Sequence, residues 1–226
     1  MINYNKIIFL SALVLMMPVT SFSHQGEHGV NQLTVKLGPT FIHPNDDSSR
    51  LGEFSNSSVS VESAKTLGIT FDYRFAPNWS AEFLGIIPTK HDIDGRGSLA
   101  NVGEIADVKV LPPTLTLKYH INNSSAFKPF IGAGINHTLF FDKDVTSGTE
   151  GALLGDTKLK VDNSWGLALQ AGFDFDLGNN WLLSSSVWYI DVDADASLNT
   201  GDVQRDIDID IDPWVIMLGI GKRFDV

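Results

Sequence analysis

The chain has 226 residues, no cysteine and a formal net charge of -11 at pH 7. The lack of cysteine excludes a disulfide framework, and the acidic balance argues against a nucleic-acid partner, whose phosphates repel negative charge. No run of eighteen or more apolar residues is present, which excludes helical membrane spans. The length suits one large β domain or two ordinary domains.

The first 23 residues have the three parts of a secretory signal peptide. MINYNK supplies a short region with one lysine, IIFLSALVLMM is apolar, and PVTSFS ends in small residues. A single membrane anchor is the alternative, but Pro18 ends the apolar stretch after eleven residues, and a span needs about 20. We therefore expect cleavage after Ser23 and a single mature domain from residue 24 to residue 226.

Alternation of apolar and polar residues with a period of two predicts eight β-strands in the mature chain. The pattern is clearest over residues 164–177, where large apolar side chains share one face and Gly166, Gln170 and Asp174 share the other. In chain order, the expected strands are 32–43, 64–75, 79–90, a segment ending at 111–121, 127–141, 164–177, 181–198 and 205–224.

The connections between these strands alternate in length. Tight turns are expected at 76–78, 122–126 and 178–180, and long polar loops near 44–63, 91–104 and 142–160, with a shorter loop at 199–204. This order is typical of an all-β fold, an eight-stranded antiparallel up-and-down transmembrane β-barrel. A soluble β-sandwich or a lipocalin-like barrel would also alternate. Apolar ladders of about 9 to 11 residues, with aromatic residues at their ends, favour the membrane barrel.

Five stretches carry a resemblance to a known family. They are LPPTLTLKYH (111–120), FKPFIGAGINHTLFF (127–141), DNSWGLALQAGFDF (162–175), NWLLSSSVWYIDVDA (180–194) and IDPWVIMLGIGKRF (211–224). In this order and at these separations, they resemble the OmpW family of Gram-negative outer-membrane proteins. The chain departs from the family pattern at its end, where Asp225 and Val226 follow Phe224 and Lys222 replaces an aromatic residue.

The resemblance implies a monomeric barrel in the bacterial outer membrane with both termini in the periplasm. It also implies a narrow, largely hydrophobic lumen that passes small apolar molecules, and contacts with lipid and lipopolysaccharide. Some members of the family serve as receptors for bacteriocins or phage. Two functions thus stay open: a passive channel for small hydrophobic molecules, or a surface receptor or adhesion barrel that acts through long acidic loops.

Two strands carry aspartates in phase with a lipid-facing ladder. The even positions from Asp206 to Asp212 continue as Trp214 to Ile220, and Asp191 and Asp193 share a phase with Tyr189. Since carboxylates are costly in hydrocarbon, the barrel is expected to rise above the bilayer with a wet exterior and an apolar interior. The expected lumen lining is Leu84, Ile86, Trp188, Ile190, Val192, Ile207, Ile209 and Ile211.

An alternative reverses this assignment. A β-bulge near Asp212 and Pro213 would shift the phase and turn the aspartates inward. If they face outward instead, rows of like charge on neighbouring strands repel each other. Relief by divalent cations is then a hypothesis, and the residues expected to bridge them are Asp191, Asp193, Asp206 and Asp208. The spacing lacks the glycine and glutamate of a calcium-binding EF-hand loop.

An enzyme is not expected. His43, His91, His120 and His137 lack metal-ligand spacing, and no G-x-S-x-G, Walker or H-E-x-x-H motif is present. His120 falls on the inward face beside Lys118, and both are assigned as polar residues of the lumen in preference to catalysis. No catalytic residue, metal or cofactor is therefore predicted.

Overall fold

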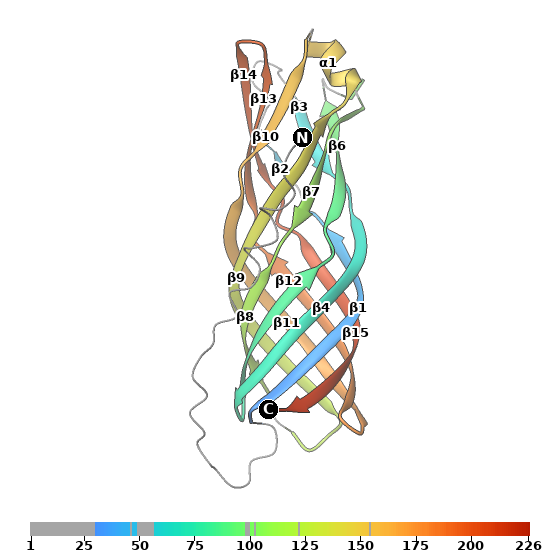
Figure 1. Ribbon diagram of the computed structural model, residues 1–226, viewed down its shortest axis with the longest axis vertical. Coiled ribbons are helices and arrows are strands. Elements are labelled where there is room, and N and C mark those ends of the chain that lie inside the picture. The colour runs from blue at the N-terminus through green and yellow to red at the C-terminus, as the bar shows by residue number, and fades with distance from the viewer. Residues whose placement is uncertain are drawn as a thin grey trace.

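The described chain closes into an eight-stranded antiparallel β-barrel that stands upright in Figure 1. It is a computed structural model that describes residues 30–45, 47–48, 57–97, 100–101, 103–121, 123–153 and 155–226. The fold class predicted from the alternation is confirmed. The expected signal peptide lies outside the described residues, so cleavage after Ser23 stays a prediction.

Most of the eight strands are divided into a lower and an upper segment. The segments are β1 (Gln32–His43), β2 (Asp47–Ser48), β3 (Ser57–Val61), β4 (Ala64–Ala76), β5 (Trp79–Ile86), β6 (Thr89–Gly97), β7 (Glu104–Leu111), β8 (Thr114–His120), β9 (Phe127–Val145), β10 (Thr157–Val161), β11 (Ser164–Gly178), β12 (Trp181–Ile190), β13 (Asp193–Thr200), β14 (Val203–Asp210) and β15 (Trp214–Asp225). A short helix, α1 (Ser147–Leu153), lies at the top of Figure 1. Among the described residues, no helix is long and apolar enough to cross a membrane.

The lower barrel is a single closed ladder. Its strands follow the order β11-β12-β15-β1-β4-β5-β8-β9, and β9 pairs with β11 to close the ring. The first strand pairs with the last, with Leu33 opposite Phe224, so both strand ends meet beside the tight turns at the lower end (Figure 1). This pairing leaves the lower barrel without an open edge, as a membrane barrel requires.

We call the level at which the strand lines are interrupted the waist. The interruptions include residues 44–45, 87–88, 112–113, 191–192 and 211–213. Three prolines from different lines, Pro44, Pro112 and Pro213, line the same small cavity. Proline has no backbone N–H to donate to a ladder, which explains breaks at these positions. The break at 191–192 contains no proline and was not predicted, because the alternation runs through it unchanged.

Above the waist the barrel continues in two groups of strands. One group has the order β10-β13-β14-β2, and the other consists of β9, β7, β6 and β3. The expectation of long loops near 44–63, 91–104 and 142–160 was therefore wrong, because these segments contain β2, β3, β6, β10, helix α1 and the end of β9. The outward residues of these segments are polar because the segments extend beyond the membrane. In the sequence, this polar composition resembles that of a loop.

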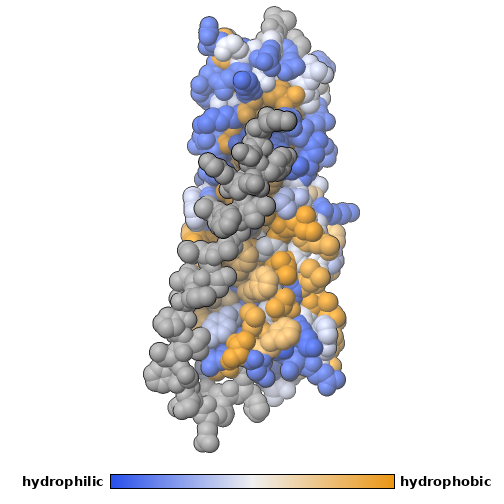
Figure 2. Space-filling view, viewed as in Figure 1, coloured by the Kyte–Doolittle hydropathy of each residue, from blue (hydrophilic) through white to orange (hydrophobic). Residues whose placement is uncertain are grey.

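The outer surface changes character at the waist. Exposed large hydrophobic residues from all eight strands form a belt around the lower barrel. On the face drawn in Figure 2 this belt lies below a mainly hydrophilic upper part. Aromatic pairs lie towards both ends of the belt: Trp79 packs edge-on against Tyr119 at 5.1 Å between ring centroids near the tight turns, and Tyr189 lies 5.2 Å from Trp214 at the waist. This belt with aromatic borders is the surface that faces lipid.

The inside of the lower barrel is filled by buried charges, which we call the plug: Lys36, Asp72, Glu82, Lys118 and Asp174. The ammonium of Lys118 lies 2.6 Å from a carboxylate oxygen of Asp72 and 2.9 Å from one of Glu82. Lys36 lies 3.0 Å from Asp174 and 3.4 Å from Glu82. Each carboxylate therefore has a cationic partner, which a buried charge needs.

Neutral side chains complete the plug. Gln170 donates from Nε2 to Glu82 at 2.6 Å and accepts the hydroxyl hydrogen of Thr116 on Oε1 at 2.7 Å. The ring of Phe130 lies below the Lys118 ammonium, 3.8 Å from its centroid, and gives the cation a favourable face. These contacts tie β8, β9 and β11 to β5 across the lumen and fill the interior of the lower barrel.

Lys118→Met tests the plug. It leaves Asp72 and Glu82 with one cation fewer in a dry interior, and we expect a loss of about 3 to 5 kcal/mol in the free energy of unfolding. Urea unfolding in lipid vesicles measures this loss. Lys109→Met is the matched control, because its pair with Asp142 is exposed and its loss should change stability little. Equal effects of the two substitutions would contradict a stabilising role for the plug.

Candidate solute-binding lumen

The interior above the plug is mainly apolar, with Thr89, His91 and Thr138 as polar residues among its buried side chains. A cluster of buried hydrophobic side chains extends from the upper part of the lower barrel, through the waist, into the extension. Trp188 and Ile190 are fully buried, and Val192, Ala194 and Ile209 have exposed fractions of 2%, 2% and 5%. Apolar side chains therefore face the axis at the same height at which carboxylates cover the outside.

The structure places most of the expected lining residues inside the barrel. Leu84 and Ile86 of β5 are buried in the same cluster as Trp188, Ile190 and Val192, and Ile211 is half-buried against it. Ile207 pairs with Ala196 across the ladder, but its side chain lies outside the described part of the structure. Their role as a path for solutes stays a prediction.

The phase of the last strand line does not change at Pro213. Asp212 adopts a positive φ of 37° at the interruption between β14 and β15, yet Asp208 and Asp210 above it and Trp214 below it are all exposed. The alternative in which a bulge turns the aspartates inward is therefore not realised. The strand bends at the waist without exchanging its faces.

A cavity of about 40 Å³ lies inside the waist. Its lining combines residues from both halves of the barrel: Ile42, Pro44, Val61, Thr89, His91, Val110, Pro112, Thr138, Phe140, Val192, Ile211, Pro213 and Val215. Sequence reasoning did not name most of these residues, because several fall in segments assigned to loops. A signal was present in the alternation of Thr89, His91 and Ile93 with charged neighbours.

His91 is the one histidine in this lining. Its Nδ1 lies 2.9 Å from the backbone oxygen of Glu62, so this nitrogen carries the proton and donates. The Nε2 atom then accepts from the hydroxyl of Thr89 at 2.8 Å. Burial lowers the pKa of His91 below its ordinary value, so the ring is neutral at neutral pH and adds no charge to the lumen.

The other expected polar residues lie lower. Lys118 belongs to the plug, and His120 lies near its lower end, where Nε2 is 2.8 Å from the hydroxyl of Ser80. His43 and His137 lie elsewhere, one bonded to Ser63 and the other stacked on Trp165. The four histidines therefore do not meet at one place.

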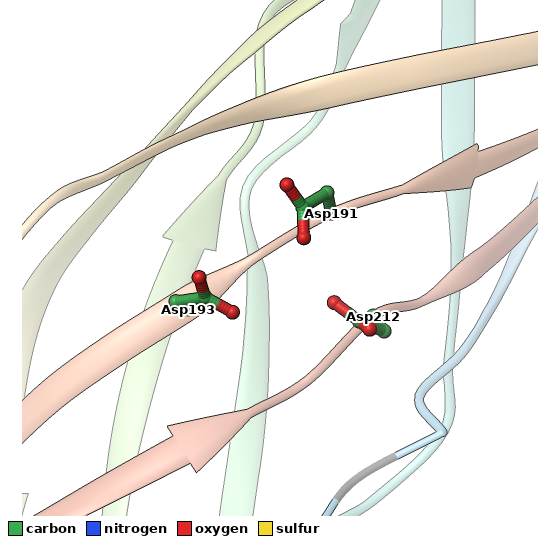
Figure 3. Close-up of side chains that lie close together, drawn as sticks. All are labelled: Asp191, Asp193 and Asp212. Atoms are coloured by element: carbon green, nitrogen blue, oxygen red, sulfur yellow. The ribbon is translucent and has the colours of Figure 1, made fainter.

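The outward aspartates of β13 and β14 lie directly opposite each other. Asp193 pairs with Asp210, and Asp195 pairs with Asp208, across the ladder. Figure 3 shows Asp191, Asp193 and Asp212 gathered at the waist, where one carboxylate oxygen of each lies within 4.8 Å of the others. Cation bridging was expected to involve Asp206 and Asp208 as well; Asp206 faces Ser197 instead, and bridging at either place stays a prediction.

Comparison with known proteins assigns the barrel to a family. The model of the OmpW family matches residues 29–224. The chain belongs to the OmpW family. Outer membrane protein W of Vibrio cholerae serotype O1 is 36% identical over 217 residues, which cover 95% of this chain and 97% of the relative. The resemblance drawn from the five sequence stretches is confirmed.

Solved structures agree with this assignment. The crystal structure of the outer membrane protein OprG from Pseudomonas aeruginosa is 36% identical, with a TM-score of 0.81, and covers 87% of this chain and 97% of that one. The solid-state NMR structure of outer membrane protein AlkL in DMPC lipid bilayers is 26% identical, with a TM-score of 0.67, and covers 90% and 95%. The protein is therefore an integral outer-membrane barrel whose hydrophobic belt contacts lipid.

The orientation in the membrane follows from the barrel. In outer-membrane barrels the short turns and the chain termini lie on the periplasmic side, and the longer segments lie outside the cell. The upper extension, with its aspartate rows and α1, therefore faces the exterior. The apolar part of the interior lies towards that side, and the plug lies towards the periplasmic side.

Asp193 gives a test of the aspartate rows. Loss of hydration and then the carboxylates of Asp191, Asp210, Asp212 and Asp195 raise its pKa above the ordinary value of 3.8. The folded protein thus binds this proton more readily than the unfolded chain, and the repulsion is relieved as the pH falls through the folded pKa. We expect Asp193→Asn to raise the melting temperature at pH 7 and to lose this advantage as the pH approaches 3.8.

The comparison is the difference in melting temperature between variant and parent at each pH, because carboxylates far from Asp193 titrate equally in both proteins. Asp202→Asn is the control, since Asp202 lies in the turn between β13 and β14 and not in the paired rows. An advantage of Asp193→Asn that is the same at every pH, or that is absent, would show that the rows do not repel.

Proposed function

We propose that the protein is a passive channel through which small hydrophobic molecules cross the outer membrane. The observation that carries this proposal is the inversion above the waist, where carboxylates cover the outside and aliphatic and aromatic side chains face the axis. A channel for ions or sugars would need a polar wall at this height. An apolar wall instead favours hydrophobic solutes, because their free energy falls when they leave water.

Transfer of an apolar solute from water into this lumen lowers its free energy. Each square ångström of apolar surface removed from water contributes about 25 cal/mol. The lipopolysaccharide leaflet carries fixed charge and hinders apolar molecules at the cell surface, whereas the extension holds its opening above that surface. The lumen thus offers an apolar route where the surrounding exterior is charged.

The path does not continue straight down the barrel. The plug fills the lower lumen, and an apolar molecule that entered it would separate buried ion pairs. The waist offers another way out, because Pro44, Pro112 and Pro213 line the cavity and lack the backbone N–H that a continuous ladder would use. We therefore infer that solutes leave sideways, at the waist, into the hydrocarbon layer that surrounds the belt.

The cavity must widen for this passage. Its present volume of about 40 Å³ accommodates little more than a few water-sized groups. Backbone hydrogen bonds still join neighbouring strand lines here, from Asn45 N–H to Ile211 O and from Ile211 N–H to Val192 O, so opening has to break them. A single chain closes the barrel, and we propose that the monomer is the working unit; binding of lipopolysaccharide, bacteriocins or phage stays a prediction.

Ile209→Asp tests the channel. A carboxylate at this buried position opposes an apolar solute, and we expect uptake of N-phenyl-1-naphthylamine by cells with an intact outer membrane to fall at least about tenfold, which needs only about 1.4 kcal/mol of added barrier. The measurement is the rise of probe fluorescence in cells that produce equal amounts of folded protein.

Val203→Asp is the matched control, because the same change is made on the same strand at an exposed position. Val192→Trp, which fills the cavity without adding charge, should also reduce uptake. A heat-dependent shift in gel mobility checks that each variant is folded. Unchanged uptake in both lumen variants would overturn the proposed channel.

A further inference from the structure

A groove on the outer wall of the barrel lies just below the waist. It has a volume of about 370 Å³ and is lined by residues 169–171 of β11, Val187 and Tyr189 of β12, and Trp214 of β15. Leu169 and Trp214 are exposed side chains of the hydrophobic belt, so the groove opens towards lipid and not into the lumen. Pockets for small ligands occupy about 300 to 1,000 Å³, and this groove lies at the lower end of that range.

The groove arises from small side chains that lie among large ones. Ala171 lies opposite Val187 in the ladder between β11 and β12. Towards the waist, Leu169 lies opposite Tyr189, and Tyr189 lies opposite Trp214. The small pair therefore forms the floor, and the three large side chains form the upper wall. A floor without polar side chains suits an alkyl chain, because hydrocarbon is favoured in apolar surroundings.

Three carboxylates lie at the upper end of the groove. Tyr189 belongs to both features, because it lines the groove and its hydroxyl donates to Asp212 at 2.8 Å. One carboxylate oxygen each of Asp191, Asp193 and Asp212 lies within 4.8 Å of the others (Figure 3). In the described part of the chain, no lysine, arginine or histidine forms an ion pair with any of the three. The rim of the groove is thus negative, and its floor is apolar.

A primary ammonium group matches this rim in charge and in geometry. It carries three N–H donors at tetrahedral angles, and charge-assisted N–H···O bonds have lengths of about 2.8 Å. Three acceptors around such a group are therefore about 4.6 Å apart. This spacing agrees with carboxylate oxygens that lie within 4.8 Å of one another. The positive charge would also relieve the repulsion between the three carboxylates at the border of the hydrocarbon layer.

We propose that the groove binds an amphiphile with a primary-amine head group and an alkyl tail. The ammonium lies among the three carboxylates, and the tail lies over Ala171 and Val187 in the outer leaflet. A divalent cation also neutralises carboxylates, but it makes no use of the apolar groove below them. The groove and its negative rim together therefore favour the amphiphile. This site is on the outer wall and does not depend on the proposed channel.

The site is tested with two labelled amphiphiles in phosphatidylcholine nanodiscs that hold the folded protein. Hexadecylamine and hexadecanol, each with a nitroxide in the middle of the chain, differ only in the head group, and the amine is protonated at neutral pH. We measure, in a chelating buffer, the content of each probe that halves the amide signal of Val187. The amine should act at about fivefold lower content, because an exposed charge pair contributes up to about this factor. The amide of Phe83, on the outer wall of β5, should respond equally to both probes.

A pair of double substitutions tests the head group. Asp191→Asn combined with Asp193→Asn removes two charges and keeps Asp212, whose two carboxylate oxygens accept hydrogen bonds within the protein. The preference for the amine should then disappear. Asp195→Asn combined with Asp208→Asn is the matched control, because it removes the same charge from a facing pair on the same two strands above the groove. This control should keep the preference.

Ala171→Phe tests the tail, because it fills the floor of the groove without a change of charge. The preference for the amine at Val187 should again be lost. Ala81→Phe is the matched control: it makes the same change on the outer wall of β5, opposite the exposed Leu117, and should leave the preference at Val187 unchanged.

Equal action of the amine and the alcohol on the parent protein would overturn the proposed site. A preference that survives the double substitution of Asp191 and Asp193 would overturn it as well. If the preference survives Ala171→Phe, the carboxylates attract the amine without the groove, and the proposal is wrong. None of these results decides the channel, since the groove and the lumen lie on opposite sides of the wall, and Ile209→Asp should leave the preference unchanged.

Discussion

The period-two alternation of a β-strand is the constraint on which the rest of the structure depends. A strand that crosses the waist without a change of phase keeps the same alternate positions on the outside. The remaining positions face the lumen, whatever residue types the exterior requires. Below the waist, lipid demands apolar residues outside, and the polar ones turn inward. Above it, water accepts aspartates outside, and isoleucine and valine turn inward. The positive φ at Asp212 bends the chain but preserves this parity.

The exchange of polar and apolar faces at the waist divides the barrel into two parts with different roles. In the membrane, charged groups inside a narrow barrel must pair with each other, and the ion pairs of Lys36 and Lys118 hold opposite walls together. Above the membrane, the same inward positions are mostly apolar, with Arg205 of β14, opposite Leu198, as an exception. The waist joins the ion-paired lower half to the mainly apolar upper interior. The proposed sideways exit depends on this boundary.

The sequence predicted the barrel well because lipid imposes a strong pattern. The ladder of 164–177 became β11 (Ser164–Gly178), and the line from 205 to 224 became β14 and β15. The upper strands β2, β3, β6 and β10 were mistaken for loops, since only their inward residues alternate regularly against a uniformly polar exterior. The plug was missed for another reason: Asp72, Glu82 and Asp174 each stood opposite an apolar ladder in the sequence, but no pattern within one strand reveals which strands bring them together.

The central claim is that the interior is apolar at the height where the exterior is charged. The chain has no cysteine, so single cysteines can carry spin labels at chosen positions without further changes. The decisive measurement is the accessibility of labels at positions 208 and 209 to oxygen and to a polar nickel complex in lipid bilayers. The account predicts that the label at 208 is relaxed mainly by the nickel complex and the label at 209 mainly by oxygen. A label at 209 that is as accessible to the nickel complex as the one at 208 would mean a water-filled lumen and would contradict it.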